Sequence, residues 1–284
     1  MTHIVEVQTS PRPLAALRLL RRAGDGLAQR IVPTLLGLSI LVALWQVAAW
    51  ISGGTLPTPW ATARVLRELL ANPFYDNGPN DKGIGLQLLA SLGRVATGWS
   101  IGVAVAVPLG LLIGSNPRLN RMLAPVIEIL RPVSPLAWYP LGLAVVHNAP
   151  KAIVFAIVIT SLWPTLINTS LGVQSLPDDL KAVARVFQFS RMRYLRRVLL
   201  PAAFPSILTG MRLSMGIAWM VIVAGEMLAG GTGIGFFVWD SWNALSLERV
   251  ISAILVIGVT GLVLDRLFGV IGQRMAAWNK GGQQ

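Results

Sequence analysis

Long apolar stretches separated by short polar segments make up most of the chain. A helix needs about 20 mostly apolar residues to cross a bilayer. Six segments meet or approach that length: 31–52, 89–114, one within 122–146, one within 152–174, one within 207–229 and one within 250–272. The pattern predicts an all-α integral membrane protein with six transmembrane helices. The third segment contains Glu128, Arg131, Pro132, Pro135 and Pro140, which indicates a helix that is broken or lies near the surface.

Composition and charge support a membrane protein and fix its orientation. Only 13% of the 284 residues are charged, against about 25% in soluble domains. The formal net charge is +12. With the N-terminus in the cytoplasm, most Lys and Arg fall in the cytoplasmic pieces 1–30, 115–121, 175–200 and 265–284. This agrees with the positive-inside rule, places both termini in the cytoplasm and explains the basic charge without nucleic acid.

The spans divide the chain into regions. Residues 1–30 are expected to form a cytoplasmic N-terminal tail, 31–52 the first transmembrane helix, and 53–88 an outer loop that includes a short helix, ATARVLRELLA. Residues 89–275 hold the other five spans, and 276–284 form a cytoplasmic tail. The chain has no cysteine, so disulfides and thiolate metal sites are excluded.

The most informative segment lies between the fourth and fifth spans, SLPDDLKAVARVFQFSRMRYLRRVLLPAAFP, residues 175–205. Leu180, Val183, Ala184 and Phe187 recur at helical spacing and form one apolar face. Ser190 can cap a second short helix, in which apolar residues alternate with arginines until Pro201 and Pro205 end it. Such an amphipathic pair on the cytoplasmic side could lie on anionic lipid or dock into a groove of a partner protein.

This segment resembles the cytoplasmic coupling loop of ABC importer permeases, whose pattern is E-A-A, three residues, G, nine residues, then I-x-L-P. When the pattern is aligned on Val198, Leu200 and Pro201, its Gly falls on Gln188 and its E-A-A on Ala182, Val183 and Ala184. The Glu and the Gly are absent. Four further stretches occur in the order found in the family: LPTPWATARVL, SLGRVATGW, LRPVSPLAWYPLGLAVV and LPAAFPSILTGMRLSMGIAWMVIVAGEML. The resemblance, to permeases of nitrate, sulfonate, taurine and bicarbonate importers, covers about 56–275. ARVFQFS and GIGFFVWDSWN are most similar to nitrate-type members.

The resemblance implies a type I ABC importer permease fold in the bacterial inner membrane, with 53–88 periplasmic and 89–275 as the permease core. It implies a second permease subunit, giving a homodimer, two cytoplasmic ATPase subunits and a periplasmic solute-binding protein. The coupling loop would be 175–201, with these residues meeting the ATPase: Leu180, Ala182, Val183, Ala184, Phe187, Gln188, Val198, Leu200 and Pro201. The chain has no G-x-x-x-x-G-K-[ST] motif, so ATP and Mg²⁺ are expected on the partner, with no cofactor here.

Four charged residues in or beside the spans are candidates for the translocation path. Arg94, Arg131 and Arg212 could each meet an anion, or each could extend toward lipid phosphate. Glu226 should face the bundle or an aqueous path because an acid is costly in lipid. It could act in transport, or it could brace the bundle by pairing with Arg94 or Arg131; we favour bracing.

Small and aromatic residues in the spans have simpler interpretations. Gly98 and Gly102 allow close helix approach, within the subunit or between subunits. Trp99, Trp163 and Trp219 are expected to serve packing. The glycine-rich GGTGIG at 230–235 follows no strand and is interpreted as a turn rather than a nucleotide loop.

These observations indicate a permease subunit, without enzymatic activity of its own, that carries a small oxyanion. Nitrate is favoured, with nitrite, cyanate and bicarbonate as relatives and a sulfonate or taurine permease as the alternative. An ion-coupled secondary transporter usually shows internal repeats, and none is visible. A membrane enzyme would need a cluster of acids, His or metal ligands, and the sequence has none.

Overall fold

The computed structural model describes residues 13–79 and 81–281, which divide into two compact units on either side of Thr62. The first unit contains α1 (Pro13–Ile51) and the start of α2 (Pro59–Ala71). The apolar part of α1, Val32–Ile51, has a mean hydropathy of 1.9 and agrees closely with the predicted span 31–52. The helix begins at Pro13, so part of the segment expected as a tail is helical. The first twelve residues of that tail lie outside the described residues.

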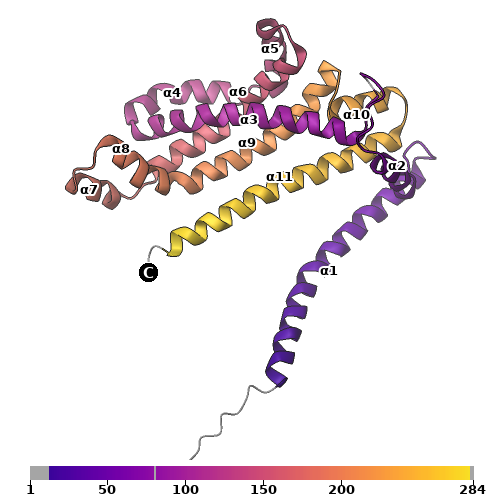
Figure 1. Ribbon diagram of the computed structural model, residues 1–284, viewed down its shortest axis with the longest axis horizontal. Coiled ribbons are helices and arrows are strands. Elements are labelled where there is room, and N and C mark those ends of the chain that lie inside the picture. Colours follow the sequence, from indigo (N-terminus) through magenta and orange to yellow (C-terminus); the bar gives the residue numbers. More distant parts are fainter. Residues whose placement is uncertain (1–12, 80, 282–284) are drawn as a thin grey trace, which may run out of the picture. The chain divides into compact units, whose positions relative to one another are not determined.

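The second unit is helical throughout most of its length. Its helices are α3 (Ile84–Ser115), α4 (Pro117–Leu130), η1 (Pro135–Ala137), α5 (Trp138–Val146), α6 (Ala149–Gln174), α7 (Asp178–Val186), α8 (Arg191–Tyr194), η2 (Leu195–Leu199), α9 (Leu200–Ala229), α10 (Ile234–Asn243) and α11 (Leu247–Gly281). The long helices α3, α6 and α9 pack together, and α11 packs along α9 (Figure 1). Ile153, Ile157 and Ile222 are almost fully buried in their core.

Small residues bring α3 and α6 into close contact. A Cβ added at Gly98 would lie 2.8 Å from Ile157 Cγ2, and one added at Gly102 would lie 2.9 Å from the Val158 carbonyl oxygen. Neither position has room for a side chain. The structure therefore assigns the Gly98–Gly102 pair to a helix contact within the subunit.

The third predicted span is broken, as its prolines indicated. The helix axis turns by 89° between Pro117–Leu130 and Pro135–Val146. Pro132 and Pro135 remove two backbone N–H groups from this link and so interrupt the helical hydrogen bonds. Among the described residues, five helices are long and apolar enough to cross a membrane, or six when the bent pair counts as one span.

The prediction that Pro201 and Pro205 end the second coupling helix is wrong. The chain is helical from Arg191 to Ala229, and this stretch is long and apolar enough to cross a membrane. Pro201 therefore lies inside a continuous helix, two residues after the end of the turn η2. The preceding turn, η2, is a π-helix in which Leu200 N–H donates to Leu195 O, five residues back. This wider turn leads the coupling segment directly into the fifth span.

The outer parts of the second unit include the predicted surface helix and one helix that the sequence did not reveal. ATARVLRELLA lies within α2. A short turn follows, closed by an ion pair of 2.5 Å between Lys82 Nζ and Asp76 Oδ2. α10 falls in a region expected to be a loop. α11 continues to Gly281, past the predicted end of the sixth span, so the described part of the predicted C-terminal tail is helical.

Candidate functional site

Glu226 is fully buried near the end of α9, and three groups donate hydrogen bonds to its carboxylate. Arg94 Nη1 donates to Oε1 at 2.5 Å, and the Ser91 hydroxyl lies 2.9 and 2.7 Å from the two oxygens. Gly235 N–H donates to Oε2 at 3.0 Å. The structure thus selects Arg94 from the two predicted partners of Glu226. The contribution of this pair to transport stays a prediction.

In the glycine-rich segment 230–235, residues 230–233 form a turn between α9 and α10, and the last two residues begin α10. The segment wraps around this carboxylate. Gly233 has φ of 152°, and a Cβ added there would lie 2.2 Å from Glu226 Cδ. Arg94 Nη1 also donates to the Thr232 carbonyl oxygen at 2.6 Å. Glycine is required at 233 because the backbone there lies against the acid, whereas Gly230 and Gly231 have open space around them.

Two more side chains of α3 hold the turn, and the sequence interpretation missed them. Gly233 N–H donates to Gln87 Oε1 at 2.5 Å, and Ile234 N–H donates to Ser91 Oγ at 2.9 Å. Gln87, Ser91 and Arg94 are spaced at i, i+4 and i+7 on an otherwise apolar helix. That polar stripe was the signal that could have revealed them. We call these three residues, Glu226 and the turn the carboxylate cradle.

Arg212 is paired with an acidic side chain of the same chain. Its guanidinium makes a bidentate contact with Asp265 on α11, with both N–O distances 2.6 Å. The pair is half-exposed. Each charge is compensated by the other, so neither residue presents a net charge to its surroundings.

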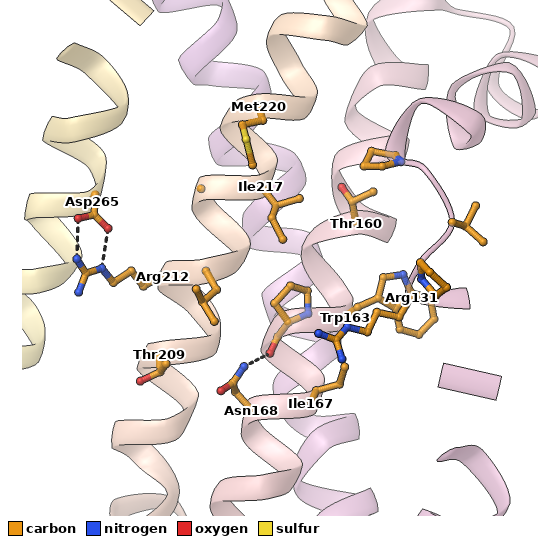
Figure 2. A pocket seen from close by; sticks show the side chains of 16 residues that line it. Arg131, Thr160, Trp163, Ile167, Asn168, Thr209, Arg212, Ile217, Met220 and Asp265 are labelled. Carbon is orange, nitrogen blue, oxygen red and sulfur yellow. Dashed lines mark hydrogen bonds and ion pairs between the residues drawn. The ribbon is translucent and has the colours of Figure 1, made fainter. Parts of the chain in front are cut away.

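Arg131, at the end of α4, lines a cavity of about 820 Å³, and its guanidinium has no hydrogen-bond or ion-pair partner among the described residues. The cavity is bounded by the bent link between α4 and α5 and by α6, α9 and α11, and Figure 2 shows its side chains. Arg212 and Asp265 line it as well. Arg94 and Glu226 do not. The structure therefore brings two of the four predicted charged candidates to one cavity and the other two to the carboxylate cradle.

Some polar side chains of the cavity donate hydrogen bonds within the protein, and others do not. Thr160 and Thr209 each donate to a backbone carbonyl four residues back, and Asn168 Nδ2 donates to Pro164 O at 2.8 Å. The indole N–H of Trp163 is buried and has no partner. Trp99 and Trp219 differ, because Trp99 Nε1 donates to Ser214 Oγ at 2.9 Å and Trp219 Nε1 to Ile257 O at 3.1 Å. The packing interpretation suits those two, whereas Trp163 keeps an unused donor.

The predicted coupling segment contains a helix that ends in a left-handed turn. Gln188 has φ of 46°, and Phe189 N–H donates to Ala184 O at 3.0 Å. This is the 6→1 bond of a Schellman motif. Glutamine, at the position where the family pattern has glycine, therefore adopts a left-handed conformation that favours glycine, at some cost in backbone strain.

The side chains of the coupling segment form an apolar surface flanked by cations. Phe187 is 66% exposed, and Val186 and Met192 are also exposed. Ala184 is only 7% exposed, so this predicted contact residue faces inward. The exposed arginines Arg191, Arg193, Arg196 and Arg197 follow in the sequence. We call the surface of Leu180, Val186, Phe187 and Met192 the coupling surface.

The remaining predicted coupling residues lie in different parts of the segment, and the side chain of Val183 is outside those that the structure describes. Ala182 is exposed, whereas Val198, Leu200 and Pro201 lie in η2 and the start of α9. Val198 and Leu200 pack against a small core around Leu199 and Ala203. Val198 and Leu200 therefore anchor the coupling segment to the helical core and do not form part of its exposed surface. No group of three or more His, Cys, Asp or Glu that could hold a metal occurs in the described part of the chain.

Comparison with known proteins agrees with this architecture. Residues 106–277 match the family described as binding-protein-dependent transport system inner membrane component. The chain is 41% identical over 242 residues to the nitrate import permease protein NrtB of Synechocystis sp., covering 85% of this chain and 88% of that protein. It is also 41% identical over 255 residues to the bicarbonate transport system permease protein CmpB of Synechococcus elongatus, covering 89% and 90%.

A solved structure of the MetNI methionine ABC transporter shares the fold, with a TM-score of 0.58 at 14% identity, over 66% of this chain and 93% of that one. The fold is thus that of type I ABC importer permeases. The chain belongs to the family of binding-protein-dependent transport system inner membrane components. It is a multi-pass transport component of the inner membrane and a permease of the ABC importer class.

Proposed function

We propose that this chain forms the translocation path of an ATP-driven importer for a small oxyanion, with nitrate as the substrate. The observation that carries the proposal is the cavity in which Arg131 is an uncompensated cation. The 41% identity to a nitrate permease supports the substrate. Bicarbonate is the second candidate, because a bicarbonate permease is equally similar.

The coupling surface is where the partner ATPase docks in this proposal. Phe187, Val186 and Met192 expose apolar area beside a run of arginines on a segment that the positive-inside rule assigns to the cytoplasm. The π-helical turn η2 joins this surface to α9 without a break. Motion of an ATPase against the segment could therefore be passed directly to the helix that borders the cavity.

The other partners and the topology follow from the same proposal. A second copy of the chain completes the path as a homodimer, a periplasmic binding protein delivers the anion, and both termini lie in the cytoplasm. ATP and Mg²⁺ bind to the ATPase subunits, so this chain needs no cofactor.

Phe187→Asp tests the docking surface, because the side chain is 66% exposed and its replacement should leave the fold intact. We expect the variant to lose co-purification with its ATPase subunits. Leu245→Asp is the matched control, since Leu245 is 86% exposed in the turn between α10 and α11. Equal recovery of ATPase with both variants would contradict the docking proposal.

Substrate choice is tested by competition. Vesicles that hold the complete transporter should take up labelled nitrate, and excess unlabelled bicarbonate or taurine should compete less well than nitrate itself. Uptake of taurine in place of nitrate would assign the chain to the sulfonate group.

A further inference from the structure

We infer that Arg131 and the indole N–H of Trp163 together bind the transported anion in the 820 Å³ cavity. This inference rests on the proposed function and names the residues that would act in it. It also separates Arg131 from Arg94 and Arg212, which the sequence could not distinguish from it.

The charges of the cavity leave one net positive group. Its ionisable lining residues are Arg131, Arg212 and Asp265. Arg212 and Asp265 hold each other in a bidentate pair, so their fields largely cancel at a distance. An anion entering the cavity is therefore attracted mainly by Arg131.

The hydrogen-bond donors give the same result. The hydroxyls of Thr160 and Thr209 and the amide of Asn168 donate to backbone carbonyls of their own helices. Asn168 keeps one unused amide N–H, and Arg212 keeps an unused Nη1. The guanidinium of Arg131 and the indole N–H of Trp163 are the donor groups of the described lining side chains that make no hydrogen bond at all. Neither group can accept a hydrogen bond. The pair therefore suits a ligand that offers acceptors.

The chemistry of a planar oxyanion matches these two donors. The fork of N–H groups on a guanidinium binds two oxygens of a planar anion in parallel. The indole N–H is left for the third oxygen. It is covered in this conformation, so the side chains around it must shift before it contacts the anion. A buried N–H without a partner is unfavourable, and binding an anion would relieve this.

The position of Arg131 between two cavities fits a role in passage. A second cavity of about 220 Å³ lies beside the first, and Arg131 and Ile167 line both. Glu128, one turn earlier on α4, lines the second cavity but makes no ion pair with Arg131. Arg131 thus lies at the boundary between the two cavities, where it can bind an anion that passes from one to the other.

A charge-selective reporter tests the site without relying on transport. The chain has no cysteine, and Gly216 lines the cavity with open space where a Cβ would be added. Gly216→Cys in the purified complex would react with an anionic sulfonatoethyl or a cationic trimethylammonioethyl methanethiosulfonate. We expect Arg131→Gln to lower the anionic-to-cationic rate ratio about five-fold or more, because one charge is removed from a confined space.

Matched variants separate this effect from general ones. Arg121→Gln changes the same residue type on the same helix but outside the cavity, and it should leave the ratio unchanged. Nitrate should slow the anionic reagent only when Arg131 is present. An unchanged ratio in Arg131→Gln, with no protection by nitrate in the parent, would overturn the inference.

Uptake measurements address Trp163. Trp163→Phe keeps an aromatic ring and removes the N–H, and we expect about a ten-fold rise in the KM for nitrate, as for loss of a hydrogen bond to a charged group. ATP hydrolysis stimulated by the loaded binding protein should persist. Trp138→Phe is the control, because its N–H is also buried without a partner but does not line the cavity. Equal KM values in both variants would remove Trp163 from the site.

The outcomes distinguish the inference from the proposed function. Nitrate uptake that survives Arg131→Gln would overturn the anion site and leave the importer in place. Absence of anion uptake by the parent complex would overturn the proposed function. The reagent ratio would then still decide whether Arg131 makes the cavity selective for anions.

Discussion

Replacing Arg94 with Gln should strongly destabilise the protein, because it leaves the Glu226 carboxylate buried without its cation. Glu226 has no solvent exposure, and the Arg94 side chain is 20% exposed. The substitution removes two hydrogen bonds, to Glu226 Oε1 and to the Thr232 carbonyl oxygen. The Ser91 hydroxyl and the Gly235 N–H remain, but neither carries a positive charge.

The magnitude follows from what is left unpaired. Removing one partner of a buried ion pair costs about 3–5 kcal/mol, most of it from the uncompensated charge. Glu226→Gln removes that charge, keeps an acceptor oxygen and should cost about 1–3 kcal/mol. The double variant should therefore be more stable than the sum of the single effects predicts, with a coupling energy of roughly 2 kcal/mol.

The assay is a double-mutant cycle on unfolding free energies in mixed lipid–detergent micelles, with nitrate uptake measured in parallel. Additive effects, with coupling below about 0.5 kcal/mol, would refute the interaction. The bracing interpretation of Glu226 would be contradicted if Glu226→Gln folded and assembled normally yet abolished transport.

Three further predictions follow from the backbone and the outer turn. Gln188→Gly should stabilise the coupling segment by about 0.5–1 kcal/mol, because glycine adopts the φ of 46° without strain; slower amide exchange at Phe189 would show it, and faster exchange would contradict it. Gly235→Ala should destabilise the protein by about 2 kcal/mol or more, since the new Cβ would lie 2.1 Å from the Val223 carbonyl oxygen. Gly216→Ala, where the Cβ meets open space, should be neutral or slightly stabilising. Equal melting temperatures for the two variants would contradict this prediction. The hydrogen bond from Lys82, and then that from the Gly78 N–H, lower the pKa of Asp76. The outer turn should therefore keep this stabilisation above the unfolded pKa of about 3.9 and lose it as the pH falls through the lower folded pKa. Amide exchange of Gly83 should become faster over this pH range, and Asp76→Asn should abolish the pH dependence.

The hydrophobic pattern predicted the spans well because length and apolarity alone decide which segments can cross a bilayer. The prolines at 132 and 135 were enough to indicate the break in the third span. The expectation that proline ends a helix failed at Pro201, because the helix continues through this residue from a π-helical turn into α9. Only the structure shows that a π-helical turn precedes it.

Contacts between distant segments could not be derived from the pattern. Glu226 lies 132 residues from Arg94, and both predicted arginine partners were equally plausible by composition. For Arg212 the sequence left an anion contact and extension toward lipid phosphate both open, because its partner, Asp265, is 53 residues away and was assigned to the cytoplasmic piece 265–284. Trp163 was grouped with Trp99 and Trp219, since the sequence does not show which indole N–H finds an acceptor. The candidate path residues are therefore distinguished by whether their side chains find a partner on another helix, and the sequence positions of the helices do not show this.

The coupling segment has a left-handed turn at Gln188, where the family pattern has glycine. The sequence could not show which backbone conformation glutamine adopts at this position. The structure has the left-handed conformation and the Schellman hydrogen bond. The turn at the end of α7 thus forms without glycine.

The most direct test of the central claim is the initial rate of labelled nitrate uptake by vesicles containing this chain with its ATPase subunits and binding protein. We predict uptake that requires ATP and is lost in Phe187→Asp but retained in Leu245→Asp. Uptake that proceeds without ATP and follows an ion gradient would contradict the account.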